Sequence, residues 1–145
     1  MLAQRLIDGL YTEAMLLADE ARGYFDDSGA SGRGELAPLD RVVFSCESLK
    51  VTTRLMHVIA WLLTQRAVEA GEIAPDDARS PARRLGGAVA SEEATLARMP
   101  ADARTLIEGS IELYRRVERL DAGTRDDSVA PSPARHLLHR LERAF

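Results

Sequence analysis

The sequence holds one cysteine, one tryptophan and one lysine in 145 residues, and it has no long apolar run. A single thiol, Cys46, excludes an internal disulfide and is typical of a reducing compartment. Cys46 lies among apolar residues, so we expect a buried structural thiol and not a nucleophile. The longest apolar run, residues 58–63, is too short to span a bilayer, and the N-terminus lacks the apolar core of a signal peptide. We therefore expect a soluble, cytoplasmic protein that does not bind membranes.

The chain has no net positive charge, and it has only three histidines. The net charge is −4 and the isoelectric point is about 5.4, which gives no electrostatic reason to expect nucleic-acid binding. His136 and His139 are spaced to share a helix face, but no carboxylate accompanies them at the spacing that a di-metal site in a helical bundle requires. No glycine-rich nucleotide motif follows a strand. We predict no catalytic residue, no metal ligand and no cofactor, so the protein is expected not to be an enzyme. A ligand- or metal-binding helical bundle, or an enzyme subunit, is the alternative.

Apolar residues recur with helical periodicity, and no stretch alternates as a strand would. The pattern predicts an all-α protein, a three-helix bundle with helices over residues 3–25, 39–70 and 100–121. The central helix is the longest. The segment between the second and third long helices, residues 71–99, is called the second connection. Short helices are expected in it, because it contains three sequence signals for the start of a helix, namely Pro75, Ser80-Pro81 and Ser91-Glu92-Glu93.

The composition changes after Asp121, where glycine, two prolines and paired aspartates follow. We predict a bundle domain over residues 1–121 and, over residues 122–145, a flexible linker with a short amphipathic C-terminal segment. In a helix over residues 135–145, four apolar side chains share one face; they are Leu137, Leu138, Leu141 and Phe145. This face is expected to dock either on its own bundle or on a partner, and the linker favours a partner.

The central helix carries two apolar rows on opposite faces. The first row has alternating steps of three and four residues and is predicted to build the core of the protomer; its members are Leu39, Val42, Cys46, Leu49, Thr53, Met56, Ala60, Leu63, Ala67 and Ala70. The second row is predicted to form a homodimer interface through Val51, Leu55, Val58 and Leu62, in line with Phe44. The alternative is that helices of the same chain cover both faces.

A flank between these rows combines cationic side chains with the single tryptophan. Arginine beside tryptophan is a frequent composition of interface anchors, so we predict a partner-binding surface made of Lys50, Arg54, Trp61 and Arg66. Arg66 projects nearer the other flank. The alternative is that Trp61 packs under the third helix or under the second connection.

Residues 47–72 resemble the long helix of the RcdA family, the regulators of CtrA degradation. The specific elements are Thr52-Thr53-Arg54-Leu55 and Trp61-Leu62-Leu63 followed by Gln65-Arg66-Ala67, while residues 80–86 and 113–121 are similar more loosely. The resemblance implies a dimeric three-helix bundle without enzymatic activity. It implies an adaptor in cell-cycle proteolysis that works with CpdR-like and PopA-like partners to deliver CtrA-like regulators to the AAA+ protease ClpXP, in the cytoplasm or at the cell pole. The short tail departs from the family and leaves the cargo open.

Overall fold

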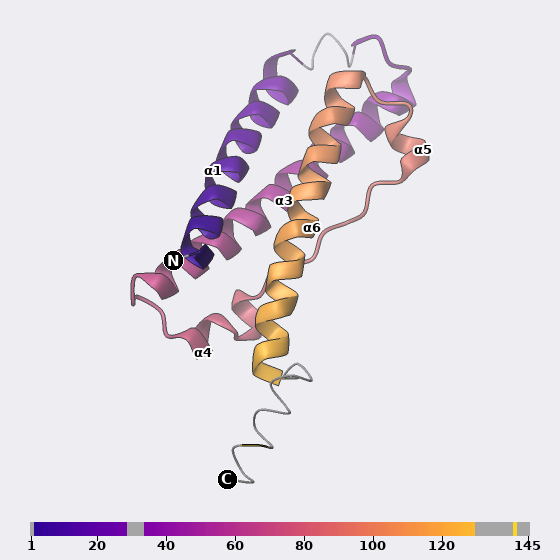
Figure 1. Ribbon diagram of the computed structural model, residues 1–145. Helices are drawn as coiled ribbons and strands as arrows, with labels where there is room; N and C mark the ends of the chain where they lie inside the picture. The colour runs from indigo at the N-terminus through magenta and orange to yellow at the C-terminus, as the bar shows by residue number, and fades with distance from the viewer. Residues whose placement is uncertain (1, 29–33, 130–140, 142–145) are drawn as a thin grey trace.

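The computed structural model describes residues 2–28, 34–129 and 141. Three long helices form a bundle, α1 (Leu2–Gly23), α3 (Pro38–Glu69) and α6 (Ala101–Val129), and no strand occurs in the described residues (Figure 1). The all-α prediction and the long central helix, which has 32 residues, are confirmed.

Helix α1 packs on α3 and α6 through a stripe of buried small and apolar side chains, Leu10, Ala14 and Ala21. It continues into a π-helical turn, η1 (Tyr24–Ser28). The Phe25 ring lies edge-on to the Phe44 ring, with the centroids 5.3 Å apart. This aromatic contact ties the end of α1 to the start of α3.

Helix α3 begins and ends within one residue of its predicted limits. Pro38 occupies its first turn, where a missing N–H costs nothing. At its end Gly71 adopts a positive φ of 78°, and the N–H of Glu72 donates to the carbonyl of Ala67 at 2.9 Å. This is a glycine-dependent Schellman ending, which stops the helix at the predicted place.

The second connection contains the three short helices that the start signals predict, namely α4 (Pro75–Ala78), η2 (Pro81–Arg83) and α5 (Glu93–Leu96). Residues 84–92 between η2 and α5 form no helix. We call this stretch the strap. It runs alongside α6 from the α4 end of the bundle towards α5 (Figure 1).

Helix α6 extends eight residues beyond the predicted boundary at Asp121, so the linker prediction is wrong for residues 122–129. Gly123 costs about 1 kcal/mol relative to alanine, which is too little to stop a long helix, and the first proline comes only at Pro131. The division into a bundle and a C-terminal segment otherwise stays a prediction.

The two faces of α3 are reversed relative to the prediction. The row predicted as a dimer interface is buried inside the single chain, because both α1 and α6 pack on it; its exposed fractions are Val51 1%, Leu55 3%, Val58 0% and Leu62 0%. The interface prediction for these residues is therefore wrong, and they form the protomer core. The row predicted as the core faces outward, and its exposed fractions include Leu39 74%, Val42 59%, Leu49 66%, Met56 64% and Leu63 47%. Cys46 is also exposed, so it is not a buried thiol.

Candidate protein-interaction surface

Most of the predicted partner-binding flank holds the strap against the bundle. The Lys50 ammonium donates a hydrogen bond to the carbonyl of Ala90 at 3.1 Å and forms an ion pair with Oε2 of Glu47 at 2.7 Å. Glu47 itself is buried. Lys50 thus links a buried carboxylate of its own helix to the strap.

Arg54 is buried and bridges three elements. Its Nη1 donates to the Ser110 hydroxyl of α6 at 3.3 Å, and its Nη2 donates to the Ser91 hydroxyl at 2.6 Å and to the carbonyl of Val89 at 3.0 Å. Burial lowers the pKa of the Arg54 guanidinium, and the charge of Glu47 opposes that shift. A guanidinium satisfies several acceptors at once, which is why it can be buried here.

Asp121 of α6 is a second residue that holds the strap against the bundle. It accepts a hydrogen bond from Nε1 of Trp61 at 3.0 Å and pairs with Arg84 at the start of the strap through contacts of 2.7 and 2.9 Å. The hydrogen bonds to Asp121 raise the pKa of Arg84. Trp61 is therefore bound to the third helix, which is one of the two alternatives stated for it.

At Gly86 the backbone of the strap passes close to the His57 ring of α3. A Cβ atom at this position would lie 2.7 Å from Nδ1 of His57, so only glycine fits without displacement. On the other side, the Tyr114 hydroxyl donates to the carbonyl of Gly86 at 2.7 Å. Burial, together with the carboxylates of Glu118 and Asp121, raises the pKa of Tyr114.

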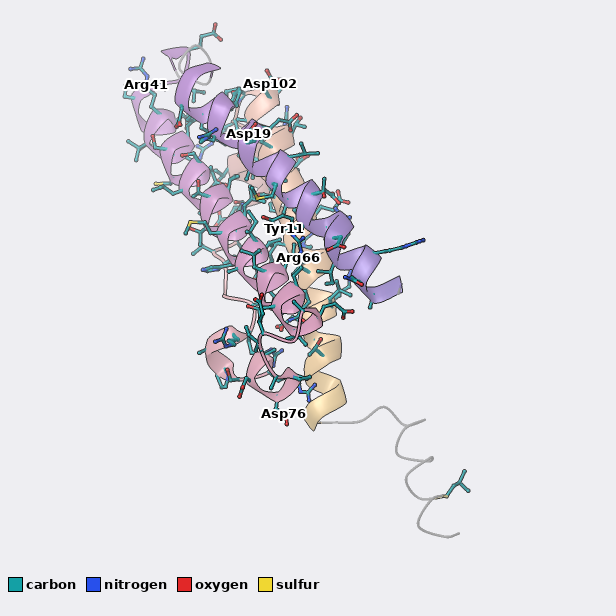
Figure 2. All side chains as sticks on the ribbon, turned by 90° about the vertical axis from the view of Figure 1, so that its left-hand side faces the viewer. Tyr11, Asp19, Arg41, Arg66, Asp76 and Asp102 are labelled. Carbon is teal, nitrogen blue, oxygen red and sulfur yellow. The ribbon has the colours of Figure 1, made fainter. Side chains whose placement is uncertain are left out.

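The prediction of an exposed partner surface is therefore wrong for Arg54 and Trp61, which are 2% and 4% exposed and bound within the chain. Arg66 lies on the opposite flank, where it stacks over the Tyr11 ring at 4.6 Å and pairs with Asp8 at 3.4 Å (Figure 2). Lys50 and Arg66 keep part of their side chains exposed, and their role in partner binding stays a prediction.

An apolar surface stays open along the outward row of α3, which we define as Leu39, Val42, Cys46, Leu49, Met56 and Leu63. It extends over about 36 Å of helix. The residues interspersed along this face carry no charge; they are Ser45, Thr53, Ala60 and Thr64. An apolar groove of about 360 Å³ between α1 and α3 adjoins the row and shares Leu49 and Met56 with it.

No group of three or more metal-ligating side chains occurs in the described part of the chain. None of the helices in that part combines the length and the apolar content needed to cross a membrane. Three of the predicted docking residues, Leu137, Leu138 and Phe145, lie outside the described residues, as do His136 and His139. Leu141 is described; it is helical and 53% exposed, and its docking stays a prediction.

A protein family and a solved structure are similar to this chain. A family model described as a protein of unknown function, DUF1465, matches residues 1–145. The crystal structure of RcdA from Caulobacter crescentus CB15 superposes with a TM-score of 0.67 at 35% sequence identity, and the match covers 82% of this chain and 90% of that chain. No curated protein matches the chain.

Proposed function

Because the chain belongs to the DUF1465 family and is RcdA-like over 82% of its length, we propose that it is a non-enzymatic adaptor in cell-cycle proteolysis. It helps to deliver a CtrA-like transcriptional regulator to the ClpXP protease in the cytoplasm. The structural observation that carries the proposal is the outward row of α3, an uncharged apolar face on a bundle whose Arg54 and Trp61 side chains are already bound within the chain. Such a face suits protein contacts.

The same row supports a homodimer. An apolar stripe on one helix is complementary to its own copy, because a two-fold axis brings the same residues together from both chains. The row lies opposite the protomer core, so a second copy covers it without disturbing α1 or α6. The groove beside Leu49 and Met56 offers space for side chains of the partner copy.

An adaptor of this kind changes no covalent bond. It holds the regulator near the protease and so raises the local substrate concentration. The expected kinetic effect is a lower apparent KM for degradation with an unchanged kcat.

The test measures degradation of a CtrA-like regulator by purified ClpXP, with CpdR-like and PopA-like partners present and with the chain added or omitted. The proposal predicts a several-fold fall in apparent KM at constant kcat. A variant with Leu49→Glu and Met56→Glu is expected to lose this effect, whereas Leu16→Glu, which adds a charge at an exposed apolar residue of α1, keeps it. Equal degradation rates with and without the chain contradict the proposal.

A further inference from the structure

The charged side chains beneath the strap carry an excess of positive charge. Glu47 pairs with Lys50, with 2.7 Å between Oε2 and Nζ. Arg54 is 2% exposed, and its hydrogen bonds go to two hydroxyls and one backbone carbonyl, all of them neutral. In the described part of the chain no carboxylate forms an ion pair with Arg54, and Glu47 acts on it only through its charge. Buried charges are normally paired, so one cation of this cluster lacks an anionic partner.

A pocket of about 170 Å³ lies between the strap and α6, and Arg54 forms part of its lining. We call it the strap pocket. Two further charged residues line it, Arg115 and Glu118, and both are exposed. The rest of the lining consists of Ala88, Val89, Ala90, Ser91, Ile111 and Tyr114. Among the described residues Arg115 forms no ion pair, so two guanidiniums stand against one carboxylate, and the excess of positive charge attracts anions.

The hydrogen-bond donors and the size of the strap pocket suit a single oxyanion group. A guanidinium has five N–H groups, and the hydrogen bonds of Arg54 use three of them. The Ser91 hydroxyl accepts from Arg54 at 2.6 Å and keeps its own proton to donate. Pockets for drug-sized ligands usually measure about 300–1,000 Å³, so the strap pocket is too small for a whole cofactor.

We propose that the strap pocket binds a phosphate group between the buried guanidinium of Arg54 and the exposed guanidinium of Arg115. Guanidinium groups suit phosphate because their N–H groups match its oxygens in pairs. A dianion is favoured over a carboxylate because Glu118 offsets only one of the two positive charges. A cleft of about 460 Å³ shares Ser91, Ile111 and Arg115 with the strap pocket and offers room for the rest of a phosphate monoester. The proposal does not depend on the adaptor function.

The test is an NMR titration of the backbone amides of the full chain at low ionic strength and about pH 8, with inorganic phosphate and with phenyl phosphate as the probes. Arg115→Gln removes the exposed guanidinium, and Glu118→Gln removes the carboxylate that repels the ligand. As a matched control, Arg104→Gln removes the same charge from α6 about 16 Å before Arg115 along the helix. Circular dichroism verifies that each variant keeps its helical structure.

The proposal predicts saturable binding of at least one probe, with the largest shifts at the amides of residues 88–91. Arg115→Gln is expected to weaken the binding about fivefold or more, whereas Arg104→Gln changes it by less than about twofold. Glu118→Gln is expected to strengthen it, because the repulsion is removed. Tighter binding of phenyl phosphate supports a monoester as the ligand, and tighter binding of inorganic phosphate supports the free ion.

Two results overturn the proposal. One is that neither probe binds saturably to the folded wild type. The other is that Arg115→Gln and Arg104→Gln weaken the binding equally, because the affinity then follows the net charge of the chain and not the strap pocket.

Discussion

The indole of Trp61 and the carboxylate of Asp121 are joined by a hydrogen bond of 3.0 Å between residues sixty positions apart. The same carboxylate pairs with Arg84, so one buried group connects α3, α6 and the start of the strap. A three-way contact of this kind fixes how the long helices and the second connection lie against one another.

Replacing this carboxylate should weaken the whole bundle. Asp121→Ala leaves the indole N–H without its acceptor and leaves the Arg84 guanidinium with only the backbone carbonyl of residue 121, so we expect a loss of about 1–3 kcal/mol in the free energy of unfolding. Urea denaturation followed by circular dichroism measures it. The matched control is Asp76→Ala, which removes an exposed ion pair to Arg79 and should leave the midpoint unchanged. If both substitutions lower the free energy of unfolding equally, Asp121 contributes no more to stability than an exposed ion pair does.

Neighbouring glycines in the strap provide a sharper comparison. A Cβ at Gly86 meets the His57 ring at 2.7 Å, whereas a Cβ at Gly87 meets nothing within 4 Å. Gly86→Ala should therefore cost about 1–3 kcal/mol of stability through overpacking, and Gly87→Ala should be neutral or slightly stabilising. Adding His57→Ala to Gly86→Ala should recover part of the loss. Additive effects of the two substitutions would mean that the contact does not exist.

Alkaline pH should loosen the strap through Tyr114. Burial raises the pKa of this phenol, so the folded protein favours its neutral form. The unfolded chain ionises first, near the ordinary pKa of about 10, and the stability contributed by Tyr114 is lost as the pH rises from there through the raised folded value. Tyr114→Phe should flatten the fall in unfolding free energy above pH 10. Urea denaturation between pH 8 and pH 11 checks this, and an equally steep fall in the variant would be inconsistent with it.

The limits of the helices were predictable because local chemistry sets them. Pro38 and Gly71 bound α3 where the sequence indicates, and Ser80-Pro81 precedes a short helix. The end of α6 was not predictable in this way, because a helix anchored at Asp121 continues through residues that alone would favour a linker.

The rotation of α3 was not predictable from the pattern alone. Both rows are apolar at helical spacing, so periodicity cannot tell the covered row from the exposed one. The polar residues beside the true core, Glu47 and Arg54, look like a solvated flank in sequence. Arg54 can be buried because the Ser91 hydroxyl and the carbonyl of Val89, about 35 positions away, accept its hydrogen bonds. Such long-range partners leave no local signal, and this is also why the flank was mistaken for a partner surface.

The central claim is that the outward row of α3, and not its buried row, is the intermolecular face. Light scattering of the full chain with Leu49→Glu and Met56→Glu, beside the wild type and Leu16→Glu, tests it most directly. The account predicts that the double variant keeps its helical circular dichroism while its mass falls from that of a dimer to that of a monomer, and that Leu16→Glu stays dimeric. A folded double variant with the mass of the wild type, or a wild type that is already monomeric at micromolar concentration, would contradict it.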